Sequence, residues 1–300
     1  MFNFQQNVKM KTVLIAGGTG YIGRKLALRL QEEGYEVLIL SRNPIASNHV
    51  FWNPERKEIA INACKETSVL INLCGAGINE KRWTKKRKLE LQQSRVEVTK
   101  MLFELTQTLP LEHYIGASGI TAYGADDGSI QHKEDDAYGT DFLSQLVNDW
   151  EQASDLFQSR CKVAKIRIAV TLDIETGAVQ EMARLTKVGL GAVLGSGRQQ
   201  IPWVAIEDLV DLFVFAVRQK LEGVYNSNTD NCSNKELTHA IANYYNRKIW
   251  LPNIPPIVLK LVLGEMSSLV LDGSSASNEK IRNSDFIPKF RTLSSVFGKK

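Results

Sequence analysis

The segment LIAGGTGYIGRKL, residues 14–26, constrains the fold of this chain more than any other feature. It joins a short apolar, β-branched run to a helical pattern, and it carries three evenly spaced glycines, Gly17, Gly20 and Gly23. Glycines at such a junction let the backbone turn tightly and approach a pyrophosphate, which then lies on the N-terminal amides of the helix. The segment predicts a dinucleotide-binding turn, and a purely structural glycine turn is the alternative.

The pattern around this turn predicts an α/β fold with a doubly wound parallel sheet of the Rossmann type. Buried parallel strands are near-continuous apolar runs that alternate with helices. The strand-like runs are residues 12–16, 35–43, 69–77, 113–119 and 163–170. The helical stretches are residues 24–33, about 84–108 and 142–158.

The alternation loosens after residue 171, which predicts two units. We expect an NADP-binding Rossmann domain over residues 10–171, completed by about 203–227, where a strand at 223–227 would return to the main sheet. Residues 172–202 and 228–300 would form a smaller lobe on the substrate side, with helices at 235–246 and from 257.

Composition excludes several classes of function. The net charge of +4 on 300 residues argues against a nucleic-acid partner, and no apolar run approaches the roughly 18 residues that span a bilayer. The four cysteines and four histidines show no metal-ligand spacing, so we expect no metal site. We therefore expect a cytoplasmic chain with a small-molecule substrate and no membrane partner, in an oligomeric state that stays open.

The end of the second strand-like run decides which dinucleotide is expected. NAD enzymes usually place an acidic residue here to bond the ribose 2′-hydroxyl, whereas this run ends in Ser41 and Arg42. A guanidinium beside a hydroxyl suits a 2′-phosphate. The cofactor is predicted to be NADP(H), and a solvated surface arginine is the alternative for Arg42.

A series of ordered motifs carries a family likeness across nearly the whole chain. The motifs are GGTGYIG, INLCGAGI, KRWT, SRVEVT, ASGITAYG, DFLSQLVNDWE, LGAVLGSGRQ, PWVAIEDLV, WLPNIPP and LGEMSSLVLDG. Together they resemble the epimerase-family, or YfcH-like, proteins among the atypical short-chain dehydrogenases/reductases.

The resemblance implies an extended short-chain dehydrogenase fold with NADP(H), in a family whose reaction is largely unassigned. Some relatives are described as nucleoside-diphosphate-sugar epimerases, and others are tied to bacterial or plastid division. Carried over by position, the resemblance implies cofactor contacts from Thr19, Tyr21, Ile22, Ser41, Arg42, Leu73, Cys74, Glu90, Arg95 and Thr171.

The basic run KRWTKKRK, residues 81–88, opens an amphipathic helix. We interpret its lysines mainly as a solvated face, with contact to a phosphate-bearing ligand or to nucleic acid as alternatives. Trp83, Arg87, Glu90 and Ser94 fall on one helical face, which mixes an aromatic ring, a cation and a carboxylate.

The catalytic pair of ordinary short-chain dehydrogenases is missing. These enzymes use a tyrosine and a lysine four residues later as proton donor, with a serine bonding the reacting oxygen. Ser118 stands where that serine belongs, but Phe142 and Leu146 occupy the places of the pair. Tyr123 and Tyr138 could substitute as donor, and structural packing is the alternative for both.

The glycine-rich segment GSGRQ, residues 195–199, does not follow a strand and is not a second dinucleotide turn. We expect Arg198, Gln199 and Trp203 to face the substrate cleft, with a structural loop as the equal alternative. Two functions stay open: an NADP(H)-dependent oxidoreductase or epimerase-like enzyme on an unidentified small molecule, and an NADP(H)-binding regulatory protein that has lost turnover.

Overall fold

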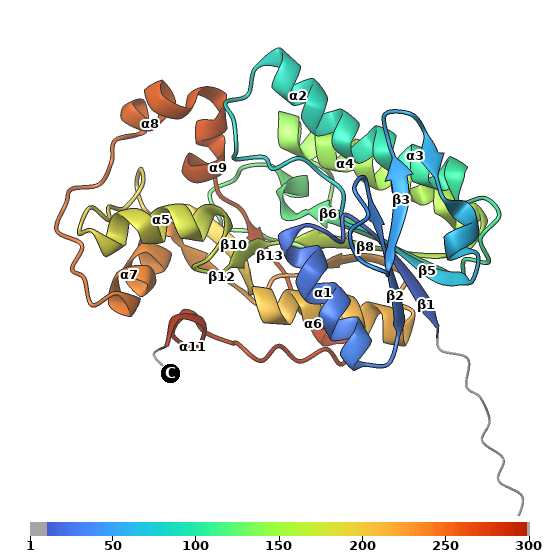
Figure 1. The fold of residues 1–300 in the computed structure, drawn as a ribbon. Helices are drawn as coiled ribbons and strands as arrows, with labels where there is room; N and C mark the ends of the chain where they lie inside the picture. The colour runs from blue at the N-terminus through green and yellow to red at the C-terminus, as the bar shows by residue number, and fades with distance from the viewer. Residues whose placement is uncertain (1–10, 299–300) are drawn as a thin grey trace, which may run out of the picture.

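The computed structural model describes residues 11–298, and a central eight-stranded sheet organises them (Figure 1). Its strand order is β11-β8-β6-β5-β1-β2-β3-β4, and every neighbouring pair is parallel except β3 and β4. The strands are β1 Thr12–Ala16, β2 Glu36–Ser41, β3 His49–Asn53, β4 Glu58–Ile59, β5 Thr67–Asn72, β6 His113–Gly119, β8 Lys162–Ile168 and β11 Gly223–Asn226. The predicted doubly wound α/β fold is confirmed, including the return of residues 223–226 to the main sheet.

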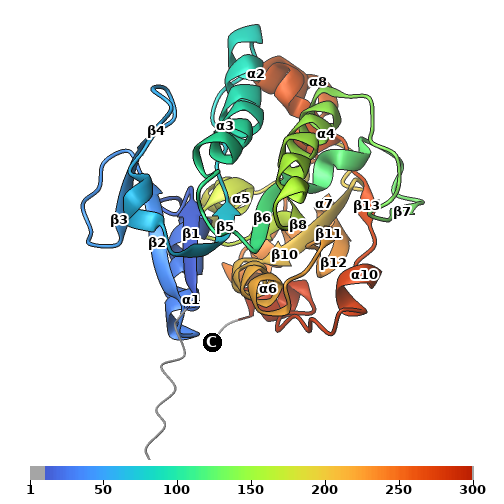
Figure 2. The same cartoon turned by 90° about the vertical axis from the view of Figure 1, so that its right-hand side faces the viewer.

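Helices cover both faces of this sheet (Figures 1 and 2). Two helices that pack against each other lie on one face, α1 Tyr21–Glu32 and α6 Ile206–Gln219. On the other face lie α2 Lys85–Gln92, α3 Val98–Leu105 and α4 Phe142–Asp155. The apolar sides of both layers pack onto a sheet whose central strand, β1, is fully buried, which makes the sheet a rigid support for a site.

The order of the strands locates the ligand crevice. The chain runs outward from β1 to β2 and β3, and then crosses back to β5 on the opposite side of β1. In doubly wound sheets, ligands bind outside the carboxyl ends of the strands where the strand order reverses. This switch point lies between β1 and β5, beside the glycine turn.

A three-stranded sheet forms a second centre of packing beyond the main sheet. It is made of β9 Val170–Leu172, β10 Gln200–Ala205 and β12 Asp230–Ser233, and it carries α5 Gly177–Lys187 and α7 Asn234–Tyr244. Trp203 and Leu237 lie in its core. The structure thus places all of β10 with the small sheet, whereas the boundary expected at residue 203 would divide this strand.

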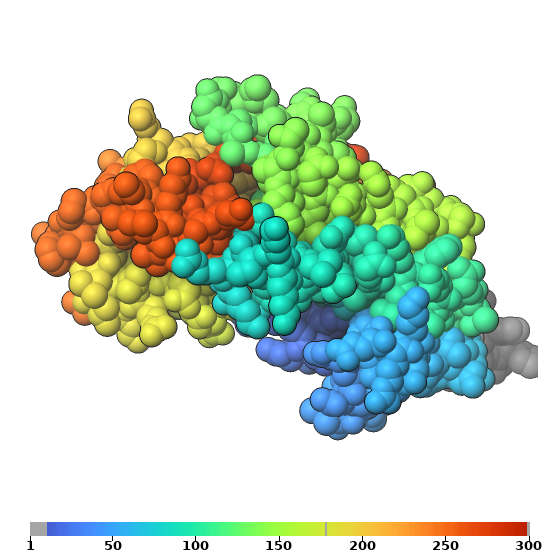
Figure 3. Space-filling model, turned by 90° about the horizontal axis from the view of Figure 1, so that it is seen from above, coloured from blue at the N-terminus to red at the C-terminus, as the bar shows by residue number. Residues whose placement is uncertain are grey.

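The C-terminal segment crosses back over the mouth of the crevice. Its elements are α8 Pro256–Leu263, the 3₁₀ turn η5 Gly264–Ser267, α9 Ser268–Leu271, β13 Ser275–Ala276, α10 Glu279–Arg282 and α11 Leu293–Phe297. Seen from above, α8 and its neighbours lie beside the segment that begins α2 (Figure 3). An ion pair of 2.5 Å between Lys88 Nζ and Glu265 Oε2 joins them.

The remaining short elements are η1 Ile61–Cys64, the π-helical turn η2 Gln93–Glu97, η3 Ile120–Tyr123, η4 Leu156–Ser159 and β7 Gln131–His132, which pairs with β13. Within residues 11–298 no helix has both the length and the apolar character that a membrane crossing requires.

Candidate functional site

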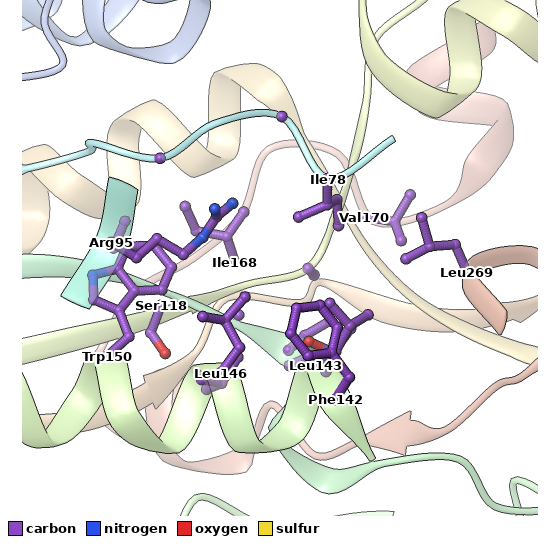
Figure 4. A pocket seen from close by; sticks show the side chains of 18 of the residues that line it. Ile78, Arg95, Ser118, Phe142, Leu143, Leu146, Trp150, Ile168, Val170 and Leu269 are labelled. Carbon is purple, nitrogen blue, oxygen red and sulfur yellow. The ribbon is translucent and has the colours of Figure 1, made fainter. Parts of the chain in front are cut away.

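A cavity of about 850 Å³ opens at the predicted switch point. The glycine turn and the residues after β5 line one end, and α4, β6 and the C-terminal segment line the other. Figure 4 shows Phe142, Leu143 and Leu146 projecting from α4 toward Ile78 and Val170, with the Ser118 hydroxyl at the floor. Of the cofactor contacts expected from the sequence, those that line this cavity are Gly17, Gly20, Tyr21, Ile22, Gly23, Leu73, Cys74 and Arg95.

Each glycine of the turn is constrained by a different neighbour. Gly17 has φ +80°, and a Cβ there would lie 2.8 Å from the carbonyl carbon of Leu73. A Cβ on Gly23 would lie 2.4 Å from the Gly17 oxygen, so this position admits only glycine. Gly20 differs, because its backbone is extended at φ −72° and its Cβ would meet only the Gly17 oxygen, at 3.2 Å. A side chain at Gly20 would therefore enter the cavity, and the turn would need to adjust only slightly at the Gly17 oxygen.

The N-terminus of α1 is open toward the cavity. Gly20 is its N-cap, no side chain caps the helix, and its first turn holds no acidic residue. Free backbone amides and the positive end of the helix dipole favour an anion such as a pyrophosphate. The Tyr21 hydroxyl donates to Asp173, and burial together with this carboxylate raises the pKa of Tyr21.

Arg95 is a cation at the cavity with no carboxylate partner among the described residues. It donates to the backbone oxygens of Leu91 and Ala76, and its guanidinium lies 5.3 Å from the centre of the Trp150 ring. Burial lowers its pKa to about 10, so it stays charged at neutral pH. A buried unpaired charge is costly, and an anionic ligand would offset that cost.

Arg95 owes its position to a break in the predicted helix 84–108. Residues Gln93–Glu97 form a π-helical turn between α2 and α3. Such bulges are frequent at functional sites because they turn side chains that a regular helix would place elsewhere. Here the bulge lets Ser94 accept a hydrogen bond from the amide of Ala76, which holds the loop after β5 against the helix.

The turn after β5 is shaped by the buried Asn72. Its amide donates to Thr99 and Tyr114, and its oxygen accepts from the amide of Cys74. The predicted strand 69–77 therefore ends at Asn72, and the residues that follow it line the cavity. Burial raises the pKa of the Cys74 thiol to about 12, although the positive charge of Arg42 acts in the opposite direction. The thiol therefore stays protonated.

Ser41 and Arg42, at the end of β2, lie in different surroundings. The Ser41 hydroxyl donates to the oxygen of Asn43 and accepts from its amide, so it is used within its own turn. Arg42 is exposed, and its charge reaches Cys74 at the edge of the cavity. Thr19, which is also exposed, presents its backbone oxygen to Arg24.

The basic run is only partly the solvated face that we expected. Arg87 is buried, and it bonds Gly77 O, Glu80 and Glu90. Glu90 is half exposed and does not line the cavity, so the structure gives it the role of a partner for Arg87 instead of a direct cofactor contact. Lys88 lies 4.8 Å from the centre of the Phe142 ring and pairs with Glu265.

The positions of the missing catalytic pair face the cavity. Phe142 and Leu146 both line it, and Trp83 packs edge-on against Phe142 at 5.4 Å between ring centres. Together with Leu143 and Val147 they form an apolar wall, by which we mean these four side chains of α4. No hydroxyl or amine on this wall can give a proton to a reacting oxygen.

Ser118 is bonded to a buried ionic network and not to the open space. Its hydroxyl lies 2.5 Å from Glu151 Oε1, and Glu151 also receives Arg167 Nε at 2.8 Å and the Tyr138 hydroxyl at 2.7 Å. Burial raises the pKa of Glu151, but Arg167 outweighs this and holds the pKa below its usual range. An ionised carboxylate only accepts, so the Ser118 proton points at Glu151, and the expected role as oxyanion donor does not match this geometry.

Neither candidate tyrosine reaches the cavity. The Tyr123 hydroxyl donates to Asn226 at 2.6 Å and accepts from Arg167, and burial raises the pKa of Tyr123 to about 12. Tyr138 is bonded to Glu151, and burial followed by that carboxylate raises the pKa of Tyr138 to about 12. The structural-packing alternative matches the placement of both, so Tyr123 differs from its expected place as proton donor.

The residues expected on the substrate side also lie away from the cavity. Trp203 is only 1% exposed and packs in the core of the small sheet. Arg198 is exposed, and Gln199 donates to the oxygens of Leu194 and Val270, which matches the alternative of a structural loop. Thr171 bonds Ala169 O within its own strand region and does not line the cavity.

Sequence reasoning missed the residues that line the substrate side of the cavity. Gln200, Ile201 and Pro202 line the cavity next to Leu269 and Asp272 of the C-terminal segment. No local motif marks them, because tertiary packing alone brings them together. Glu151 had a usable signal, since a carboxylate on the apolar side of an amphipathic helix needs a buried partner. Among the described residues no cluster of three or more histidine, cysteine or acidic side chains could hold a metal ion.

Two family models match this chain. Residues 13–144 match the NAD dependent epimerase/dehydratase family, and residues 254–298 match a domain of unknown function (DUF1731). The protein named "Epimerase family protein Mb2239" of Mycobacterium bovis is 33% identical over 95% of this chain and 96% of its own length.

Solved structures show the same similarity. The human epimerase family protein SDR39U1 (isoform 2) with NADPH superposes with a TM-score of 0.87 at 27% identity, covering 95% of this chain and 97% of that one. A nucleoside-diphosphate sugar epimerase from Corynebacterium glutamicum gives a TM-score of 0.77 at 26% identity, covering 96% of this chain and 58% of that one.

Proposed function

This chain belongs to the epimerase family of NAD(P)-binding proteins, and on that premise we propose that it is an NADP(H)-dependent oxidoreductase or epimerase-like enzyme acting on a small molecule. The observation that carries the proposal is that one cavity is lined by the glycine turn, by Arg95 and by the α4 side chains Phe142 and Leu146. Its volume of about 850 Å³ is in the range of cofactor and ligand sites.

The residues at the turn fit a nicotinamide dinucleotide. Gly20 leaves space for close approach, the open N-terminus of α1 would take the pyrophosphate, and the unpaired Arg95 would meet its charge. Leu73 and Cys74 would lie along the adenosine half, since they follow β5 at the switch point. When bound, such a cofactor supplies hydride transfer to or from a carbon of the substrate.

The preference for NADP(H) over NAD(H) rests on Arg42. It is exposed at the end of β2, and no carboxylate stands in the place where NAD enzymes usually bind the ribose diol. The human relative was solved with NADPH, which supports the same choice. The family model is described as NAD dependent, so the choice needs a direct measurement.

We expect Arg42→Ala to weaken NADPH binding about tenfold or more, because a charge-assisted contact to the 2′-phosphate contributes about 1.5–3 kcal/mol. NADH binding should stay nearly unchanged, since NADH lacks that phosphate. Isothermal titration calorimetry with both cofactors measures the difference, and Arg56→Ala, at another exposed arginine, is the matched control. Equal weakening of NADPH and NADH would contradict the assignment of Arg42.

A second candidate function is an NADP(H)-binding regulatory protein without turnover. The apolar wall favours it, because Phe142 and Leu146 face the cavity where an acid and a cation would be needed. The Ser118 hydroxyl donates its hydrogen bond to Glu151, so it does not replace the missing acid. Both candidates share the cofactor site, and turnover distinguishes them.

We expect the native protein to reduce simple aldehydes and ketones slowly or not at all, because it forgoes the 10²- to 10⁴-fold that general acid catalysis typically contributes. Restoring the pair with Phe142→Tyr and Leu146→Lys should not recover activity, since Leu146 is buried and a lysine there would lose its charge or disturb the wall. NADPH oxidation against benzaldehyde, acetone and UDP-glucose measures this, with Phe142→Tyr alone as control. Fast turnover of benzaldehyde by the native protein would show that a proton donor has been overlooked.

A further inference from the structure

The substrate half of the cavity is apolar where a ligand would meet the nicotinamide ring. The apolar wall of α4 lies on one side, and Ile78, Val170 and Leu269 lie across from it (Figure 4). Phe142 is held in place by the edge of Trp83 and by Lys88 above its ring. This shape suits a flat, uncharged ring, which would bury its faces against aromatic and branched side chains.

The charged groups around this half discourage an anionic ligand. Acidic side chains that line the cavity are Glu80, Asp141, Glu265 and Asp272, and Lys88 is paired with Glu265. Burial raises the pKa of Asp272, and the negative charge of the neighbouring Asp141 raises it further. Arg95, the other basic residue of the lining, lies at the end beside Trp150. Apart from Arg95, the described residues of the lining offer a diphosphate no cation that is free of a carboxylate partner.

The absence of a proton donor on the apolar wall narrows the reaction that can take place against it. Reduction of an aldehyde or ketone leaves an alkoxide, whose oxygen is about as basic as hydroxide. Reduction of a quinone leaves a phenol-type oxygen with a pKa near that of tyrosine, about 10. The second product is stable enough as an anion that no acid on the protein has to stand beside it.

From the apolar wall, which carries no proton donor, and from the acidic side chains of the lining we infer that the substrate is a quinone, reduced by NADPH in the space between Phe142 and Val170. This inference rests on the proposed cofactor site. Quinone reduction takes two electrons and two protons. The C4–H bond of the NADPH nicotinamide would break and supply a hydride, which carries both electrons and one of the protons and forms an O–H bond at one quinone oxygen. Water would give the second proton to the other oxygen and leave hydroxide, so the products are a hydroquinone and NADP⁺.

The experiment uses the full chain with 1,4-naphthoquinone, benzaldehyde and UDP-glucose as probes. Calorimetry first establishes that NADPH and NADP⁺ bind. Quenching of tryptophan fluorescence in the NADP⁺-loaded protein then reports probe binding without turnover, because Trp83 and Trp150 line the cavity. NADPH oxidation with each probe gives the rates.

We expect naphthoquinone to bind the NADP⁺-loaded protein and to be reduced at least about 100-fold faster than benzaldehyde or UDP-glucose, which corresponds to the lower end of what a missing general acid costs. Phe142→Ala should weaken naphthoquinone binding about tenfold or more, and Phe142→Leu should weaken it less, while NADPH binding to both stays normal and shows that they are folded. Phe51→Ala, at a partly exposed phenylalanine on β3, is the matched control.

Four results would overturn the inference. UDP-glucose binding more tightly than naphthoquinone would assign the cavity to a sugar nucleotide, and naphthoquinone that binds without being reduced would leave the second candidate function. Naphthoquinone reduction at the native rate in both Phe142 variants would place the acceptor elsewhere. If NADPH binds and naphthoquinone does not, only the inference of a quinone substrate is refuted. If neither NADPH nor NADP⁺ binds, the proposed function is refuted together with that inference.

Discussion

Replacing Gly20 with valine should abolish dinucleotide binding and leave the protein folded. The backbone at Gly20 is extended, with φ −72° and ψ 174°, a conformation that valine adopts readily. A Cβ there meets only the Gly17 oxygen, at 3.2 Å, so the branched side chain would fill the space of the pyrophosphate. We expect NADPH affinity to fall by about 100-fold or more, equivalent to about 2.8 kcal/mol. Calorimetry measures the affinity, and circular dichroism checks the fold.

The other glycines of the turn supply the contrast. Gly23→Ala should destabilise the fold itself, because its Cβ would overlap the Gly17 oxygen at 2.4 Å. Gly20→Ala should weaken binding less than Gly20→Val, since a methyl group fills less of the cavity. Normal NADPH affinity in a folded Gly20→Val protein would mean that the turn does not cradle a phosphate.

Replacing Arg167 with leucine should cause the largest loss of stability among the substitutions considered for this chain. Arg167 and Glu151 are 1% and 2% exposed and form a bidentate pair that also anchors Ser118, Tyr123 and Tyr138. Breaking one side of a buried pair leaves an uncompensated charge, which typically costs about 3–5 kcal/mol. Urea unfolding followed by tryptophan fluorescence measures the loss.

The loss should depend on pH in a defined direction. In the native protein the pKa of Glu151 is below its usual range. The ionised carboxylate therefore adds to the free energy of unfolding above the pKa of about 4.3 that glutamate has in the unfolded chain, and this stabilisation is lost as the pH falls through the lower pKa of the folded state. In Arg167→Leu the buried Glu151 has no cation beside it, so burial would raise its pKa. The free energy of unfolding of the variant should therefore be lowered most at neutral pH, where an ionised Glu151 would be buried without a partner. The difference in free energy of unfolding between the native protein and Arg167→Leu should therefore become smaller from pH 7.5 to pH 5.

Lys133→Ala provides the control for this prediction. Lys133 forms a pair with Glu279 in which both side chains are largely exposed, and such pairs contribute little to stability. The control should unfold at nearly the native urea concentration. A loss in Arg167→Leu no larger than in Lys133→Ala would show that the buried network does not hold the fold together.

Local pattern alone was enough for the main sheet. The apolar run at 12–16 is β1, and the run at 113–119 is β6, with the predicted ends. Glycine spacing between a strand and a helix also located the crevice, because the turn needs its small residues whatever surrounds it. The return of β11 to the main sheet was also predicted from the sequence.

Packing between distant segments decided what local pattern could not. The helix predicted over 84–108 is interrupted by a π-helical turn, since Ser94 must meet the loop at Ala76. The strands β3 and β4 were not predicted, because short edge strands carry a weak signal. The strand β10 pairs with β9 and β12 in the small sheet and not with the main sheet.

The same division holds for the site. The sequence by itself predicted the glycine turn from its spacing, and the family resemblance added Leu73 and Cys74; these residues line the cavity at the switch point. It also showed that the tyrosine and lysine were absent. Only the tertiary structure decided that Ser118 is bonded to Glu151, that Tyr123 and Trp203 are packed inside, and that residues 200–202 and 268–274 close the cavity. Those contacts join residues far apart in the chain, and no short-range spacing encodes them.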